Sequence, residues 1–535
     1  MPHSAAVGVR LRVLTGAVGV LLLAGCGAPS APAPSVAPGS AASSASAPAV
    51  SPTPTHDVGW VAAENAKPGT PGWEVAEATY AGDTELAGYF GQVSVTPGEA
   101  ATLYATSTDG DYTLSAYRIG YYGGAGARLV WTSPAPVKGV KQTAAKLAAD
   151  HTVTTEWTPS ATVPTDGWPE GSYVVQLSAK DGTRNRYVPL TVRTPDLAGR
   201  LVLVSAVTTY QAYNAWGGYS LYKGPDGTFS TRSRHVSFDR PYDRNGAMEA
   251  FKFELPLVSQ AEALGLDLGY TTSWDVDQRA GILEGSLGVV SEGHDEYYSV
   301  PMRDAYEHAR SSGTNLAFLG ANVAYWRVRL EDGVLGAGRL MAGYKDAAAD
   351  PVKGATTTAM WRQSPSPRPE NSLTGMLYEC FPAAGAMKIM DASFFLFEGT
   401  GAKDGVAYPG LVGTEIDRAY PIAGTPEQLQ VVAHSPVTCA GKMPTASDAV
   451  YYTDVSGAGV FSTGTMMWVN ALASRTDGTG LTDASVAFSR KVTDNLLKAM
   501  AAGPMGKEHP AKPNLAGLGA SASTKNGTGG AVAAG

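Results

Sequence analysis

Two hydrophobic patterns divide the chain. From Trp60 to about Arg193, short segments such as residues 113–117 and 173–177 alternate apolar and polar positions between turns rich in Gly, Pro and Asp. A period of two is typical of half-buried strands, and closely spaced turns favour an immunoglobulin-like sandwich. We therefore predict an all-β sandwich domain over residues 57–195.

After residue 195 the pattern changes to continuous apolar runs, at residues 201–204, 287–290 and 316–319, with amphipathic segments between them. Buried parallel strands show such runs. Pro256 can open one intervening helix, and Ser299 can cap another over residues 299–311. The alternation predicts a three-layer α/β domain with a mostly parallel sheet over residues 196–503, followed by a disordered tail over residues 504–535.

The N-terminus has the layout of a lipoprotein signal peptide. Arg10 and Arg12 precede an apolar run that ends in small residues directly before Cys26. The run is short for a membrane span, so we predict a signal peptide over residues 1–25 and lipidation of Cys26. The alternative is an ordinary signal peptide with an incidental cysteine.

Residues 26–56 are rich in Pro, Ala and Ser, as expected of a flexible linker. Together with a lipid on Cys26, this linker predicts an extracytoplasmic protein anchored to the outer face of the cell membrane. An exported compartment favours pairing Cys380 with Cys439 in a disulfide.

Composition narrows the function. The 535 residues contain 40 Lys and Arg against 48 Asp and Glu, so the formal charge is 40 − 48 = −8, and only 16% of residues are charged. A general nucleic-acid binder needs a basic face, so no nucleic-acid partner is expected.

Three loops follow the predicted parallel strands, and such loops converge at one edge of a sheet. The first and third are aromatic and polar, which suits substrate binding. Their candidate residues are Tyr210, Tyr213, Asn214, Trp216, Asn322, Tyr325 and Trp326.

The second loop holds the densest chemistry. His294, Asp295, Glu296 and Tyr297 are consecutive, and each can transfer a proton or bind a metal. In the alternative reading, Asp295, Glu296 and Ser299 only cap the following helix. We predict His294, Glu296 and Asp295, with Asn214 of the first loop, as catalytic residues.

Other familiar sites are absent from the sequence. Val289 stands where a nucleophile elbow ending at Ser291 needs glycine. The first strand is not followed by a phosphate loop, and the histidines of the folded region lack zinc-site spacing.

Four motifs carry a family resemblance: residues 212–222, residues 293–299, Asn322 with Tyr325 and Trp326, and residues 360–362. With them the chain resembles the C-terminal domain of the beta subunit of N,N-dimethylformamidase and its actinobacterial relatives. The resemblance implies a sheet domain similar to class I glutamine amidotransferases without their cysteine nucleophile. It also implies an iron ion, held by two tyrosines and a glutamate, that activates water to hydrolyse a formamide.

Carried onto this sequence, the resemblance makes Tyr297 one metal ligand and leaves Glu379 and Glu415 as candidates for the carboxylate. The second tyrosine is expected after Met248, where Phe251, Phe253, Leu255 and Pro256 stand, and none of these four can bind a metal.

The expected function is a surface lipoprotein with an amide C–N hydrolase domain, one iron ion, a small-molecule amide substrate and a possible second subunit or homo-oligomer. The alternative is a non-enzymatic protein whose aromatic residues stack on a cell-envelope glycan. These aromatic residues are Tyr210, Tyr213, Trp216, Tyr325 and Trp326.

Overall fold

The computed structural model describes residues 57–473 and 480–518. The predicted signal peptide, the lipidated Cys26 and the linker lie outside the described residues. Within the described ranges, no helix has both the length and the apolar character needed to span a membrane.

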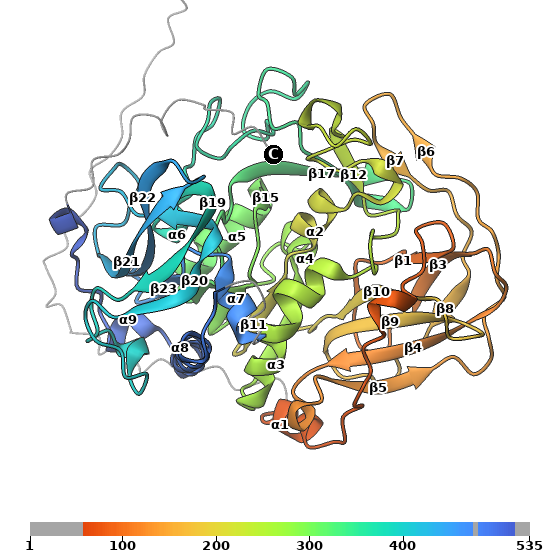
Figure 1. Cartoon of the computed structure of the whole chain (residues 1–535), viewed down its shortest axis with the longest axis horizontal. Coiled ribbons are helices and arrows are strands. Elements are labelled where there is room, and N and C mark those ends of the chain that lie inside the picture. Colours follow the sequence, from red (N-terminus) through yellow and green to blue (C-terminus); the bar gives the residue numbers. More distant parts are fainter. Residues whose placement is uncertain (1–56, 474–479, 519–535) are drawn as a thin grey trace, which may run out of the picture. The chain divides into compact units, whose positions relative to one another are not determined.

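The first strands form two sheets that share one core (Figure 1, red to yellow). One has the order β1-β3-β8 and the other β2-β10-β9-β4-β5. In β4 buried and half-buried side chains alternate, which explains the period of two in the sequence. The strands are β1 (Leu86–Phe90), β2 (Ser94–Val95), β3 (Ala101–Ser107), β4 (Tyr112–Ile119), β5 (Ala127–Thr132), β8 (Ala161–Val163), β9 (Gly171–Ala179) and β10 (Asn185–Val192). A separate hairpin joins β6 (Lys146–Leu147) to β7 (Val153–Thr154).

A seven-stranded sheet follows, in the order β13-β11-β14-β16-β23-β22-β21. Its first five strands run parallel, and β22 is antiparallel to both of its neighbours, β23 and β21. The apolar runs of the sequence are β11, β14 and β16, whose residues are all buried. The strands are β11 (Leu201–Ser205), β13 (Leu268–Thr272), β14 (Gly288–Ser291), β16 (Asn315–Phe318), β21 (Leu429–Cys439), β22 (Met443–Thr453) and β23 (Gly459–Ser462).

The helices expected between the strands are present. Pro256 lies in the first turn of α3 (Leu255–Ala263), and Ser299 caps α5 (Val300–Ser311) by accepting a hydrogen bond from the backbone N–H of Met302. The other α-helices are α1 (Trp60–Asn65), α2 (Val207–Tyr213), α4 (Ser273–Gln278), α6 (Asn371–Thr374), α7 (Met467–Leu472), α8 (Asp483–Ala502) and α9 (Met505–Glu508). A π-helical turn, η5 (Ala250–Glu254), leads into α3.

The predicted fold class is wrong. The described residues form six separate sheets, several of them small, instead of the three layers of an amidotransferase-like domain. The remaining extended segments form two further small sheets. They are β12 (His235–Ser237), β15 (Tyr297–Ser299), β17 (Trp326–Gly333) and β18 (Gly336–Ala342) in one sheet, and β19 (Leu377–Lys388) with β20 (Ala407–Arg418) in another.

The described part of the predicted tail is folded. Residues 504–518 contain α9 and a final 3₁₀ turn, and Met505 and Leu515 are buried. Residues 519–535 lie outside the described residues, and the other predicted domain boundaries stay predictions.

The disulfide between Cys380 and Cys439 is confirmed. It links β19 to β21 across a sequence separation of 59 residues, with the Cα atoms 5.9 Å apart. This crosslink ties the long hairpin to the edge of the seven-stranded sheet.

Candidate active site

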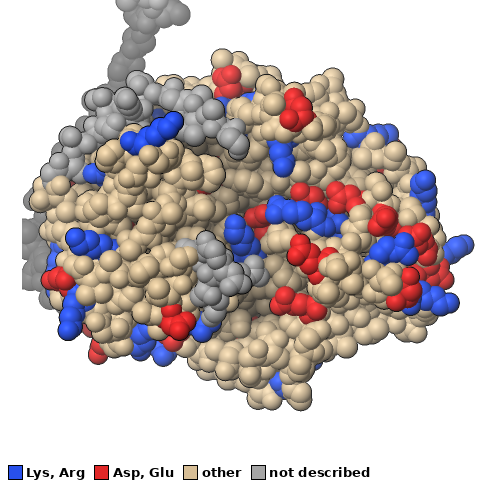
Figure 2. Space-filling view, viewed as in Figure 1, with Lys and Arg blue, Asp and Glu red and all other residues tan. Residues whose placement is uncertain are grey.

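The candidate site lies where β11, β14 and β16 end. The first strand leads into α2 with Tyr213, the second into His294 and Glu296, and the third into Asn322. The rings of Tyr213 and His294 lie 5.0 Å apart, so the first two loops meet. The face shown in Figure 2 is hollowed near its middle, in the region where Figure 1 places β15 and α2.

Glu296 is the centre of this site. The hydroxyl of Tyr213 donates to its Oε2 at 2.7 Å, and that of Tyr222 donates to its Oε1 at 2.5 Å. The two hydroxyl oxygens are 3.2 Å apart. Two phenols and one carboxylate therefore converge.

His294 faces two carboxylates. Its Nε2 lies 3.6 Å from Oε2 of Glu296 and 3.6 Å from Oε2 of Glu415 on β20. His294 Nε2, Glu415 Oε2 and Tyr297 Oη are buried and have no hydrogen-bond partner. Unpaired buried polar atoms are costly, and their gathering here is typical of a site that binds something.

Burial dominates the electrostatics. It raises the pKa of Glu296, and burial together with the charge of Glu296 raises the pKa of Glu415 well above its ordinary value. The Asn322 side chain partly offsets both rises by hydrogen bonding. Burial and then Lys252 lower the pKa of His294 to about 3, so the imidazole is neutral at pH 7.

Lys345 is a site residue that the sequence did not reveal. Its Nζ lies 3.1 Å from the ring centroid of Tyr222, 4.9 Å from Trp326 and 5.1 Å from Tyr297. Burial lowers its pKa well below the ordinary value. The only sequence signal for Tyr222 is that it ends the first family motif, and no signal marked Lys345.

The backbone is strained beside these groups. Asn322 and Ala324 adopt positive φ angles of 60° and 53°. Gly293 has φ 56°, and a Cβ on it would lie 2.8 Å from the ring of Phe253. Such conformations cluster at functional sites, where the surrounding structure holds them.

Several predicted residues lie elsewhere. The amide of Asn214 bonds Gln211 and the carbonyl of Pro241, and Asp295 accepts hydroxyls from Ser291 and Tyr298, with its pKa raised to about 6 by burial. Glu379 accepts hydroxyls from Tyr420 and Thr445.

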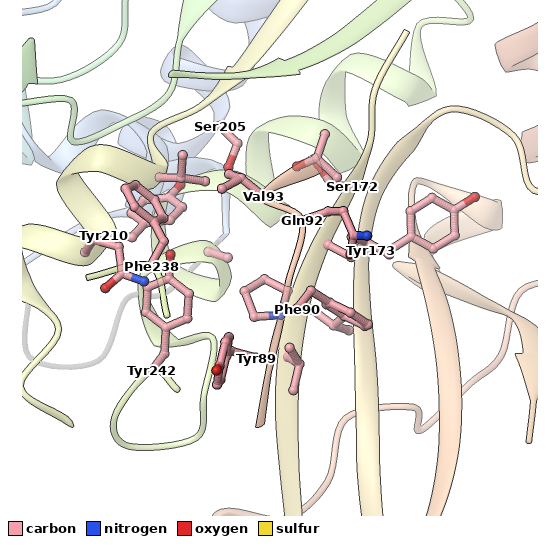
Figure 3. A pocket seen from close by; sticks show the side chains of 18 of the residues that line it. Tyr89, Phe90, Gln92, Val93, Ser172, Tyr173, Ser205, Tyr210, Phe238 and Tyr242 are labelled. Atoms are coloured by element: carbon pink, nitrogen blue, oxygen red, sulfur yellow. The ribbon is translucent and has the colours of Figure 1, made fainter. Parts of the chain in front are cut away.

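Most of the aromatic side chains predicted to stack on a ligand are packed against other side chains instead. Trp216 is buried edge-on against Trp157, and Tyr325 and Trp326 pack against each other at 4.9 Å. Tyr210 lines a separate cavity of about 50 Å³ between β9 and β11 (Figure 3), where its hydroxyl lies 3.3 Å from Glu254.

The side chains of the site differ in their ability to bind a metal ion. Among the described residues, no three His, Cys, Asp or Glu side chains are arranged to hold a metal ion. The oxygens of Tyr213, Tyr222 and Glu296 do converge, and oxygen donors of this kind suit iron.

The cluster of Glu296, His294 and Glu415 lies at the carboxyl edge of a largely parallel sheet, the edge at which such sheets bind ligands. Residues 113–480, more than half of the chain, match the family described as N,N-dimethylformamidase beta subunit-like, C-terminal, so the chain belongs to this family. No curated protein matches the chain.

Proposed function

We propose that the protein hydrolyses the C–N bond of an amide at the cluster around Glu296. The observation that carries the proposal is the convergence of two tyrosine hydroxyls on one buried glutamate, beside the unpaired atoms of His294 and Glu415. This is the donor set that the family resemblance implies, at residues other than those expected from the sequence.

In this proposal iron is held by Tyr213, Tyr222 and Glu296, in place of Tyr297, Glu379 and Glu415. Iron on such ligands polarises an amide carbonyl and lowers the pKa of water. Each tyrosine hydroxyl donates to a different oxygen of Glu296, and the two hydroxyl oxygens lie 3.2 Å apart, so the donor oxygens of all three side chains are gathered in one place.

The neighbouring residues handle the protons. His294 Nε2 and Glu415 Oε2 face each other at 3.6 Å, so a proton taken from the attacking water can pass between them to the departing nitrogen. Asn322 holds both glutamates in place, and its backbone N–H is fixed on Asp417 at 2.8 Å.

The cellular setting belongs to the same proposal. A lipid on Cys26 would tether the protein to the outer face of the membrane, where a small-molecule amide reaches it, alone or with a second subunit. A Cys26→Ser variant is expected in the soluble fraction, and its retention in the membrane would contradict the tether.

The first experiment is metal analysis of the purified full chain. We expect about one iron per chain, and its loss in Tyr222→Phe, because the phenol oxygen is removed while the ring stays. Tyr121→Phe is the control, since that side chain is 41% exposed and distant from the site.

A panel of amides then tests turnover. His294→Ala should abolish it with little change in melting temperature, whereas His308→Ala, exposed on α5, should leave it unchanged. If the Tyr222→Phe variant kept the iron content of the wild-type protein, the proposed set of iron ligands would be contradicted.

A further inference from the structure

Three arginines surround one tryptophan on the far side of β17 from the site. The guanidinium carbons of Arg327, Arg303 and Arg368 lie 4.2, 5.5 and 5.5 Å from the ring centroid of Trp361. Trp361, Arg303 and Arg327 are buried, and the side chain of Arg368 is 34% exposed. We call these residues the arginine cluster.

The acidic residues beside the cluster do not balance its charge. Glu307 pairs with Arg303 and Arg368, each at 2.7 Å, and Asp304 pairs with Arg368 at 2.6 Å. Among the described residues, no carboxylate pairs with Arg327. Three positive charges therefore meet two negative ones.

The next carboxylate along the chain is already engaged. Glu370 accepts both Nε and Nη2 of Arg362, the latter at 2.6 Å. It therefore leaves the excess charge of the arginine cluster in place.

Several donors of the cluster are unused. Nη2 of Arg327 donates to the carbonyl of Ser366 at 2.5 Å, but Nε and Nη1 of Arg327 and Nη1 of Arg303 are buried without a hydrogen-bond partner. Leaving charged donors unsatisfied costs more than leaving neutral ones, and the indole face compensates only part of the charge. Burial and the neighbouring arginines lower the pKa of Arg327 to about 10, in keeping with uncompensated charge.

We propose that the arginine cluster binds a small tetrahedral oxyanion, such as phosphate or sulfate. Guanidinium groups match the oxygens of such anions in geometry and charge, and one anion would supply both the missing charge and the missing acceptors. Arg368 is partly exposed, and the exposed residues Ser364, Pro365 and Pro367 precede it in the chain, so an anion would approach the buried donors from this side.

This site is separate from the proposed amide chemistry. Arg327 follows Trp326 on β17, and successive side chains of a strand point to opposite faces. Trp326 lies by Lys345 in the candidate active site, so the oxyanion would sit behind the same strand.

The test is thermal unfolding and calorimetry of the full chain with inorganic phosphate, against potassium chloride at equal ionic strength. We expect saturable binding and a rise in melting temperature of about 2–4 °C at saturating phosphate. Neither measurement uses iron or an amide, so failure here leaves the proposed function intact, and the reverse also holds.

Arg327→Gln should abolish the phosphate-dependent shift. If that variant does not fold, the partly exposed Arg368→Gln should weaken phosphate binding about tenfold, a loss of about 1.4 kcal/mol. Arg184→Gln is the matched control, because its side chain is 32% exposed and also pairs with a carboxylate, Asp109.

Two results would overturn the proposal. One is the absence of any saturable shift beyond that in potassium chloride, which would mean that water satisfies the free donors. The other is an equal phosphate response in Arg368→Gln and Arg184→Gln.

Discussion

Single buried charges in this protein differ sharply in how they are satisfied. Glu254 accepts the hydroxyls of Ser172, Ser205 and Tyr210, at 2.5, 2.7 and 3.3 Å. Oε2 of Glu292, equally buried, has no partner, and burial raises the pKa of Glu292 well above its ordinary value. A buried carboxylate with several hydrogen bonds, such as Glu254, can thus be assigned a structural role. A buried carboxylate oxygen without a partner, such as that of Glu292, cannot be assigned one in this way.

Glu64 belongs to the first kind and gives a pH prediction. Burial alone would raise its pKa, but hydrogen bonds from Lys67, Arg128 and Tyr122 bring the pKa below the ordinary value of 4.5. Because the folded-state pKa is the lower one, this stabilisation is fully present above about pH 4.5 and is lost as pH falls through the folded value.

Glu64→Gln should therefore lower the free energy of unfolding by about 1–3 kcal/mol at pH 7. Urea denaturation at several pH values measures this loss. The difference in free energy of unfolding between the wild-type protein and the Glu64→Gln variant should become smaller below about pH 4. A gap that is constant with pH would contradict the assignment.

Among the elements, the segment between Tyr213 and Tyr222 depends on one side chain. Arg240 is buried and donates to the carbonyls of Asn214, Trp216 and Tyr219 at 2.8–2.9 Å. The returning chain is then joined to α2 by the Leu221 N–H, which donates to the Ala212 carbonyl at 3.0 Å. These bonds bring the two tyrosines onto Glu296.

Arg240→Met should lower the free energy of unfolding by about 3 kcal/mol or more, since three buried carbonyls lose their donor. Arg240→Lys should recover part of the loss. Urea denaturation measures both, with Arg244→Met as control because that side chain is 49% exposed. A loss below that of the control would refute the role of Arg240.

The elements differ in how much of their structure could be predicted from the sequence. Apolar runs and capping residues revealed β11, β14, β16, α3 and α5, because burial and caps leave local patterns. His294 and Glu296 were found because they directly follow β14. Tyr222 and Lys345 reach the site through long-range pairing of loops, which leaves no periodic signal.

For the molecule as a whole, the predicted sandwich and sheet regions meet through a buried ion pair. Nη2 of Arg118 on β4 lies 2.5 Å from Oε1 of Glu262 on α3, and Tyr270 and Asn65 also donate to that carboxylate. Both side chains of the pair are completely buried. The family match, which begins at residue 113 within β4, includes both partners.

Arg118→Met should lower the free energy of unfolding by about 3–5 kcal/mol, because Glu262 is left as an uncompensated buried charge. The double variant Arg118→Met, Glu262→Met should recover much of the loss. As a control, Arg184→Met removes the partly exposed ion pair with Asp109 and should lower the free energy of unfolding by less than about 1 kcal/mol. Equal losses in the single and double variants would rule out charge as the cause.

The pair between Arg118 and Glu262 also constrains inheritance. A recombination event near residue 195 would join two halves from different ancestors. Each half would carry a buried charge that had evolved beside a different partner residue. Only lineages that pass on both halves together, or that change both positions in concert, keep the charge neutralised. In descendants of this chain, the sandwich strands and the sheet should therefore share one genealogy.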